Sequence, residues 1–344
     1  MPRDSDGDKI AAQRLSTVYM PGAKITMLPD SVVEAFTLCA DRVCPALSMY
    51  SEIDGETLAI LGHESRVERI HIAANLRHDT LEPLFNEETL AVGKLDYPYA
   101  NELKLLWDLV QKLEAVRGKP SDNSTQMDYN FHIENDPASE NCRVSISQRR
   151  RGSPIDKVVA ELMILVNSEW GKHLAEHGFV GIYRTQQGGK VKMSTVAAPH
   201  QGLGVAQYMW SSSPLRRYVD MVNQRQIIAM LREGEPAYPK NDPALYTTMR
   251  DFDTMYGIYN EFQRSMERYW CLRWLQQEKI ELVEALVLRE NLVKVADIPL
   301  VFRVPSLPEA LPANTRVQLA IGEIDLIDLD VQTRFVQTIE AVAC

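Results

Sequence analysis

The pattern of hydrophobic and polar positions divides the chain into a mixed N-terminal part and a C-terminal part made of strands alone. Apolar residues at helical spacing mark three amphipathic segments, because residues three and four apart share one helix face. The predicted helices cover residues 101–116, 155–177 and 249–276. Short runs of alternating polarity are typical of antiparallel strands. These strands are predicted over residues 47–53, 66–72, 129–133 and 143–147, with a buried strand over 179–184.

After Glu281 the chain alternates between short strand-like runs and prolines. The predicted strands cover residues 282–288, 291–295, 300–304 and 317–321. Short strands at this spacing are typical of a small barrel of the OB type. The sequence therefore predicts an α+β fold with two domains, one over residues 1–278 and an OB-like barrel over residues 279–344.

The composition is that of an ordinary globular protein. The 344 residues are 45% hydrophobic and 24% charged, which allows two or three domains with ample core. We find no apolar run of about 18 residues and no signal-peptide pattern, so we expect a cytoplasmic protein that does not enter a membrane. Five scattered cysteines predict free thiols rather than a disulfide framework or a zinc site.

The charge distribution limits how the chain could bind nucleic acid. A formal net charge of −10 excludes a general nucleic-acid coat, which would be basic, but not an enzyme with one basic channel. The run Arg149–Arg151 is a local candidate for phosphate contact, and a solvated loop is the alternative. Residues 297–344 hold seven acidic residues against three arginines and no lysine. We therefore expect the barrel to be structural or an interaction surface rather than a clamp for nucleic acid.

The first thirty residues are predicted to form a loop and an extended segment. Their acidic start, with Asp4, Asp6 and Asp8, suggests a solvated terminus, because chain ends are usually polar and loose. A calcium loop is excluded, since its sixth position is Lys9 rather than Gly and its twelfth is Leu15 rather than Glu.

The segment 200–225 contains the strongest candidate chemistry. Gly202 and Gly204 predict a tight turn ahead of three consecutive serines. Pro214 is predicted to begin a helix, which would place Arg216 and Arg217 in its first turn. Helix N-termini and guanidinium groups both favour anions, and a planar guanidinium matches phosphate best. The segment therefore predicts a phosphate site.

Three motifs in this chain resemble the catalytic, RNB-type domain of the ribonuclease II family, which are 3′-to-5′ exoribonucleases. Residues 212–218, Ser-Ser-Pro-Leu-Arg-Arg-Tyr, are similar to the family's Thr-Ser-Pro-Ile-Arg-Arg/Lys-Tyr. Residues 14–21 with 25–29 resemble its Arg-x-x-Ser/Thr-x-Tyr-x-Pro…Met-Leu-Pro element. Residues 158–167 resemble its Val-Glu-Glu-x-Met-x-x-Ala-Asn helix, with Ala160 in place of the first Glu. The motifs keep the family's order, so the chain is identified as a member.

The resemblance implies roles for six residues. Arg216 would be the catalytic residue that supports the scissile phosphate, and a salt bridge to Asp220 is the alternative. Tyr19 would stack on the terminal nucleotide, although a tyrosine there could equally be a core or strand residue. Glu161 would face the terminal nucleotide, where a carboxylate suits a 2′-hydroxyl. The remaining implied RNA-binding residues are Ser213, Arg217 and Tyr218. His200 is either a turn residue or a further RNA contact.

The metal ligands of the family have no match in this sequence. The resemblance implies hydrolysis of single-stranded RNA to nucleoside 5′-monophosphates with two magnesium ions, held by an Asp-x-Asp-Asp-Ala cluster some tens of residues before the first motif. Only 13 residues precede Arg14, and their aspartates do not fit that pattern. We therefore expect an N-terminally truncated member that is catalytically incomplete by itself, with no metal ligand of its own.

Three hypotheses remain open on these grounds. The chain could be most of an exoribonuclease recorded without its front end. It could be a non-catalytic relative that binds single-stranded RNA or a protein partner. It could also be one part of an enzyme that a complementing chain completes with the aspartate segment.

Overall fold

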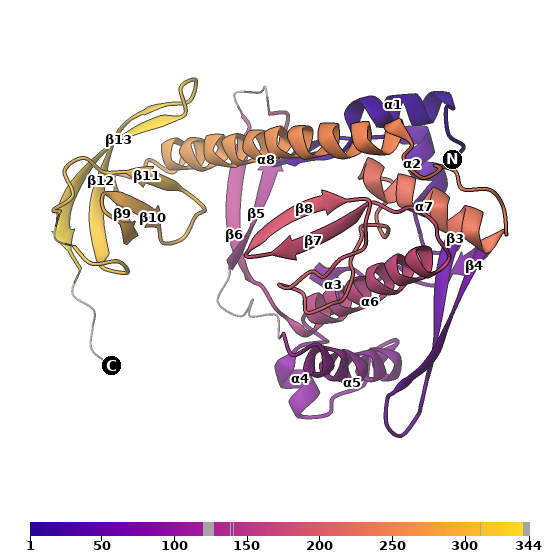
Figure 1. Ribbon diagram of the computed structural model, residues 1–344. Coiled ribbons are helices and arrows are strands. Elements are labelled where there is room, and N and C mark those ends of the chain that lie inside the picture. The colour runs from indigo at the N-terminus through magenta and orange to yellow at the C-terminus, as the bar shows by residue number, and fades with distance from the viewer. Residues whose placement is uncertain (120–126, 138, 140, 310, 340–344) are drawn as a thin grey trace. The chain divides into compact units, whose positions relative to one another are not determined.

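The computed structural model describes residues 1–119, 127–137, 139, 141–309 and 311–339 (Figure 1). Two compact units are present. Unit 1 comprises residues 1–17, 26–126 and 151–257, and unit 2 comprises residues 18–25, 127–150 and 258–344. The predicted domain boundary at residue 278 stays a prediction, since packing alone does not show which segments fold independently.

Unit 1 is built mainly from helices. These are α1 (Asp6–Arg14), α2 (Asp30–Phe36), α3 (His78–Leu81), α4 (Glu87–Ala91), α5 (Ala100–Arg117), α6 (Pro154–Glu176), α7 (Tyr218–Leu231) and the first part of α8 (Pro243–Gln277). Two antiparallel hairpins accompany them. They pair β3 (Arg42–Ile53) with β4 (Ile60–Ile72), and β7 (Tyr183–Gln187) with β8 (Lys190–Ser194). The helices expected at 101–116, 155–177 and 249–276 are confirmed, although α8 begins six residues earlier than expected.

Unit 2 consists of two hairpins, the rest of α8 and a curled five-stranded antiparallel sheet (Figure 1). The hairpins pair β1 (Val18–Met20) with β2 (Ala23–Ile25), and β5 (Met127–Glu134) with β6 (Arg143–Arg150). The sheet has the order β11-β10-β9-β12-β13. Its strands are β9 (Leu282–Arg289), β10 (Leu292–Val295), β11 (Val301–Arg303), β12 (Arg316–Asp325) and β13 (Asp330–Thr338). The predicted α+β fold with a C-terminal OB-type sheet is confirmed.

The inner face of the five-stranded sheet forms the core of unit 2. Val287, Val293 and Leu319 are fully buried there. Helix α8 adds Leu272 and Leu275 to the same cluster. The alternation of buried and exposed residues along β9 to β12 is what the sequence pattern predicts, because successive side chains in a strand point to opposite faces.

Three local predictions were wrong, and some elements were missed. The N-terminal segment forms the helix α1 instead of a loop, and β13 was not expected. Residues 179–182 lie outside any strand, and β7 begins only at Tyr183. Helix α7 begins at Tyr218, whereas Pro214 was expected to start it.

The acidic start of the chain is not a solvated terminus. Ser5 caps α1 by accepting a hydrogen bond from the Asp8 amide, at 3.4 Å. Asp4 and Asp6 are exposed as expected, but Asp8 is only 4% exposed. The reason is a buried partner, Arg225, which lies on α7 and bonds its carboxylate.

Two further expectations can be compared with the described residues. No helix among them is long and apolar enough to cross a membrane. Cys39, Cys44, Cys142 and Cys271 are free thiols, as predicted, and Cys344 lies outside the described residues.

In the arginine run, Arg149 lies 3.4 Å from Asp128 on the neighbouring strand.

Candidate functional site

Two of the three sequence motifs meet through their main chains. The Thr17 amide donates to the Arg216 carbonyl at 2.9 Å, and the Tyr218 amide donates to the Leu15 carbonyl at 2.8 Å. The Ser16 hydroxyl also donates to the Arg216 carbonyl, at 3.2 Å. This antiparallel bridge fixes the backbone of the Ser-Pro-Leu-Arg-Arg-Tyr turn. It also explains why α7 begins late, because residues before Tyr218 bond to another segment instead of continuing a helix.

The third motif joins the same site through the side chain of Asn167, at the end of the motif on α6. The Asn167 amide oxygen accepts hydrogen bonds from the Ser211 amide at 3.0 Å and the Ser211 hydroxyl at 2.7 Å. Its amide nitrogen donates to the Ser212 hydroxyl at 3.2 Å. Asn167 is 1% exposed, so these contacts satisfy a buried polar group and hold the serine segment against α6.

Arg217, not Arg216, forms the salt bridge with Asp220. Its Nε and Nη2 donate to the two carboxylate oxygens of Asp220 at 2.7 Å each, a bidentate pair. The Ser213 amide donates to the same carboxylate at 2.8 Å. Complete burial raises the pKa of Asp220, and the attraction of Arg217 and Arg216 opposes that rise. The Asp220 carboxylate therefore links Ser213 and Arg217, at the two ends of the turn, and neutralises the charge of Arg217.

Arg216 is left as the free guanidinium of the turn. Its main-chain carbonyl is fixed by the bridge described above, whereas its side chain is exposed and has no partner among the described residues. It lies close enough to Asp220 for its charge to be felt there. A fixed backbone with an unpaired, solvent-facing guanidinium is suited to binding an oxyanion.

Glu161 does not face an open site. It is 2% exposed, and both carboxylate oxygens accept from the guanidinium of Arg117. Arg117 also donates to the Leu203 carbonyl in the turn that follows His200. Gly204 is required in this turn, because its φ is +67° and a Cβ would lie 2.7 Å from the Arg117 carbonyl. A nucleotide could reach Glu161 only if this ion pair opened.

The two tyrosines of the motifs have opposite environments. Tyr19 lies on β1 of unit 2 and is 46% exposed, so its ring is available for stacking. Tyr218 is buried at the start of α7, and its hydroxyl donates to Asp8 at 2.9 Å. Tyr218 therefore supports α7 from within, and its exposure does not suit contact with RNA.

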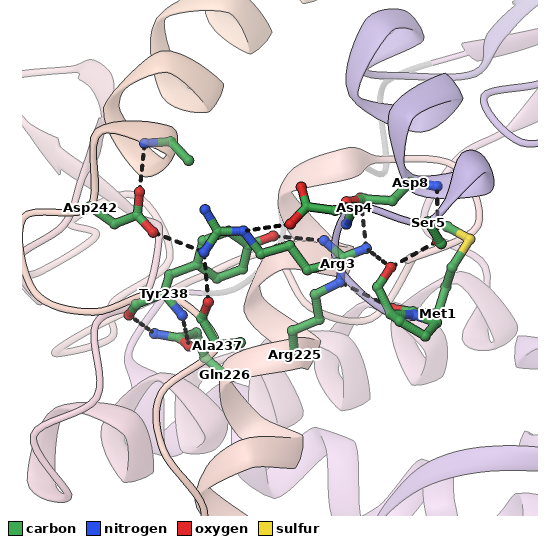
Figure 2. Close-up of polar contacts among 12 residues, drawn as sticks. Met1, Arg3, Asp4, Ser5, Asp8, Arg225, Gln226, Ala237, Tyr238 and Asp242 are labelled. Carbon is green, nitrogen blue, oxygen red and sulfur yellow. Dashed lines mark hydrogen bonds and ion pairs between the residues drawn. The ribbon is translucent and has the colours of Figure 1, made fainter.

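A buried ionic cluster, shown in Figure 2, links α1 to α7. Arg225 donates to Asp8 at 2.6 Å, to the Tyr238 hydroxyl at 2.6 Å and to the Met1 carbonyl at 3.1 Å. Burial alone would raise the pKa of Asp8, but hydrogen bonds from Arg225, the Asp4 amide and Tyr218 outweigh it and lower the pKa. Asp8 is therefore a structural carboxylate that fixes α7.

Sequence inspection missed the aromatic centre of the site. The guanidinium carbons of Arg184 and Arg217 lie over the Trp210 ring, 3.7 and 4.1 Å from its centroid. Two guanidinium groups this close would overlap on one face, so they occupy opposite faces. Phe252 and Tyr256 pack edgewise on the indole. No local pattern could reveal this assembly, because Arg184, Trp210 and Phe252 are far apart in sequence and meet only through tertiary packing.

The pairing that places Arg184 there runs along β7. The Arg184 amide donates to the Tyr208 carbonyl at 2.7 Å, and the Gln186 amide donates to the Pro199 carbonyl at 3.0 Å. His200 follows directly and is 8% exposed, with its ring packed on Tyr208. Burial, followed by the charge of Arg184, lowers the pKa of His200. His200 is thus a buried member of the site rather than a surface turn residue.

The donor set of the described residues does not fit the two-magnesium site that the family resemblance implies. Within the described ranges, no group of three or more His, Cys, Asp or Glu side chains is arranged to hold a metal ion. The two most deeply buried aspartates, Asp8 and Asp220, are each committed to an arginine. The described residues therefore supply a phosphate-directed turn without a carboxylate cluster.

Comparison with known proteins identifies the family. The RNB domain model matches residues 1–192 and 189–233, so the chain belongs to the RNB domain family. Exoribonuclease 2 of Pasteurella multocida is 25% identical over 314 residues, covering 70% of this chain and 46% of that protein. An uncharacterized ribonuclease of Synechocystis is also 25% identical over 314 residues, covering 82% of this chain and 44% of that protein. The chain spans less than half the length of these curated relatives.

Solved structures share the fold. Mycoplasma genitalium RNase R in complex with ribose-methylated single-stranded RNA has a TM-score of 0.77 at 13% identity, covering 98% of this chain and 65% of that one. An active-site mutant of the Dss1 exoribonuclease from Candida glabrata has a TM-score of 0.78 at 17% identity, covering 97% and 48%. Yeast Ssd1, a pseudonuclease, has a TM-score of 0.67 at 17% identity, covering 94% and 47%. The resemblance to this family inferred from the motifs is confirmed.

Proposed function

We propose that this chain is the RNA-holding part of a ribonuclease II-type 3′-to-5′ exoribonuclease that acts on single-stranded RNA. The observation that carries the proposal is the convergence of all three motifs on one turn, where Arg217 is neutralised by Asp220 and Arg216 is left exposed and unpaired. Phosphate is the oxyanion that RNA presents at every nucleotide. The RNA-bound RNase R structure that shares this fold supports the choice of ligand.

The motif residues then have distinct tasks. Arg216 binds a backbone phosphate, and Arg217 with Ser213 keeps the turn rigid through Asp220. Tyr19, which is exposed on β1, stacks on a base, an interaction that contributes roughly 1–3 kcal/mol in single-strand binding proteins. Glu161 and Tyr218 support the site through their buried partners.

Hydrolysis to nucleoside 5′-monophosphates would require metal chemistry that the described residues do not provide. Magnesium, when bound in such enzymes, activates the attacking water and stabilises the leaving oxygen. We propose that its carboxylate ligands come from residues outside this chain, on a missing segment or a complementing chain. The chain alone is then expected to bind RNA without degrading it. A cytoplasmic location is part of the same proposal.

The test is incubation of the purified chain with 5′-labelled single-stranded RNA and magnesium, with an EDTA control, resolved on a gel and by mobility shift. Retarded but intact RNA supports the proposal. A magnesium-dependent ladder shrinking from the 3′ end would show that the chain is catalytically complete. Failure to retard RNA would contradict an RNA-holding function.

A non-catalytic relative is the second candidate. The absence of a carboxylate cluster among the described residues and the shared fold of the pseudonuclease Ssd1 favour it. The two candidates differ in one result. Addition of a polypeptide carrying an Asp-x-Asp-Asp segment from an active relative restores metal-dependent hydrolysis if the chain is part of an enzyme. Retained RNA binding without restored hydrolysis supports the non-catalytic candidate.

A further inference from the structure

The two arginines that sandwich Trp210 differ in their other contacts. Arg217 is 9% exposed in its side chain and has its full charge matched by Asp220. Arg184 has no side-chain hydrogen bond and no ion pair with any described residue, and its guanidinium stacks on the indole ring. A guanidinium carries five N–H donors, so Arg184 retains its entire hydrogen-bonding capacity.

The position of Arg184 is fixed although its side chain is unpaired. Its main-chain amide donates to the Tyr208 carbonyl, two residues before Trp210. This bond holds β7 beside the segment that carries the indole. Trp210 is itself fixed by Phe252 and Tyr256. A guanidinium stacked on a fixed ring loses little further conformational entropy when it binds a ligand, which favours affinity.

The surroundings of Arg184 favour an incoming anion. Burial lowers the pKa of Arg184, with Tyr256 and Asp253 opposing that effect from beyond ion-pair distance. A cation that has lost hydration without gaining a partner gains most from an oxyanion. The Nδ1 atom of His200 is also buried and has no partner in the described part of the chain. The Arg184 guanidinium and the His200 Nδ1 atom are therefore two polar groups of this site that lack a partner among the described residues.

We propose that Arg184 binds a second phosphate of the single-stranded RNA, distinct from the phosphate bound by Arg216. This inference rests on the proposed function, since it takes RNA as the ligand. The ligand chemistry is a phosphodiester oxyanion received by the planar guanidinium, with Trp210 as the support beneath it. The neutralised Arg217 then acts as a positioning residue that holds the other face of the indole.

The experiment measures binding of the full chain to a short labelled oligouridylate by fluorescence anisotropy over a range of salt concentrations. We expect Arg184→Gln to weaken binding about tenfold, as loss of a charge-assisted hydrogen bond does. The slope of log affinity against log salt should fall by roughly 0.7, the value for one phosphate contact on a single strand. The control is Arg232→Gln, which removes an equal charge from the exposed C-terminal end of α7 and should leave both quantities unchanged.

A second variant distinguishes the effect of the planar guanidinium shape from the effect of its charge and from effects on folding. Arg184→Lys retains the charge, so the salt slope should match that of the unmodified chain while affinity falls several-fold, since an ammonium cannot bind bidentately. Thermal unfolding of both variants checks that the fold is retained. Wild-type affinity in Arg184→Lys would overturn the bidentate contact, even if Arg184→Gln proved unstable.

The remaining outcomes distinguish this inference from the proposed function. Unchanged affinity and slope in Arg184→Gln, with weakened binding in Arg216→Ala, would overturn the role of Arg184 and leave the proposed function intact. Absence of RNA binding by the unmodified chain would overturn the proposed function. In that case titration with inorganic phosphate, followed through the Arg184 Nε–H NMR signal, still tests the anion site, and an unmoved signal would exclude it.

Discussion

Both units bury apolar side chains, but among the described residues they differ in whether they also bury ion pairs. Unit 1 encloses three arginine–carboxylate pairs, Arg117–Glu161, Arg217–Asp220 and Arg225–Asp8, whose side chains are each at most 11% exposed. In the five-stranded sheet of unit 2, the ion pair Arg316–Glu284 is about half exposed, Arg303–Glu290 is more exposed still, and the core is apolar. Buried ion pairs add little net stability but penalise any arrangement that separates them. The difference indicates that the buried ion pairs of unit 1 mainly fix the arrangement of its helices and turns, whereas the apolar core of the sheet mainly contributes folding stability.

The largest effect should follow loss of one partner from a buried pair. Asp8→Ala leaves the Arg225 guanidinium buried without its carboxylate, which should cost about 3–5 kcal/mol of unfolding free energy. Urea unfolding followed by circular dichroism measures it. Asp6→Ala, on the same helix with a fully exposed side chain, is the matched control and should change stability by less than about 0.5 kcal/mol. Equal losses in the two variants would contradict a buried ionic role for Asp8.

Unit 2 should be equally sensitive to loss of apolar volume. Leu319→Ala removes a fully buried side chain from β12 and should cost about 2–5 kcal/mol, through lost transfer energy and a residual cavity. Ile327→Ala, at a position 93% exposed in the turn between β12 and β13, should be nearly neutral. Both are measured by urea unfolding with fluorescence detection. A small loss in Leu319→Ala would mean that the sheet is not the stabilising core.

Arg216→Ala should affect binding and leave the fold intact. The side chain is exposed and unpaired, so unfolding free energy should change by less than about 0.5 kcal/mol. Affinity for single-stranded RNA should fall by about 1.5–3 kcal/mol if the guanidinium contacts a phosphate. Arg232→Ala, at the other end of α7, controls for the change in net charge. Equal affinity in the two variants would remove Arg216 from the site.

His200 should contribute a smaller, pH-dependent effect. Its pKa is lowered in the folded chain, so below the unfolded pKa of about 6.5 the unfolded chain binds the proton more readily. Stability should therefore be complete above that pH and decrease as pH falls toward the folded pKa. His200→Gln should reduce this decrease, measured as unfolding free energy between about pH 7 and 5.

The smallest effect is expected at the exposed pair of the sheet. Breaking Arg316–Glu284 should cost about 0–1 kcal/mol, because both side chains remain hydrated and the interaction is screened by salt. A double-mutant cycle of Arg316→Ala and Glu284→Ala isolates the pair energy. A coupling well above about 1 kcal/mol would remove the contrast between the two units.

The sequence predicted elements whose periodicity is local. The helical spacing of α5, α6 and α8 and the alternation along β3 to β6 are visible without knowledge of any partner. Two errors had available signals. Ser5 followed by Asp8 is a capping pattern for α1, and the run from Val331 through Thr333 to Phe335 alternates as a strand should. These elements were recoverable from the residues themselves.

The site was predictable only in part. The motif residues could be located, but their environments depend on residues far away in the chain. Pro214 favours a helix start, and pairing with Leu15 and Thr17 overrides that preference. Arg216 and Arg217 are adjacent and identical in type, and only the position of Asp220 determines which one is free.

The hydrogen bond between Ser16 and Arg216 has a consequence for synthesis of the protein. Its two sides are 200 residues apart, so the first motif leaves the ribosome long before the segment that completes it. At about 5–20 residues per second, the N-terminal segment waits roughly 10–40 s for its partner. Buried groups such as Leu15 and Met27 are exposed on the nascent chain during that interval. The site therefore folds late in translation. Until then the N-terminal segment exposes apolar side chains to which chaperones can bind.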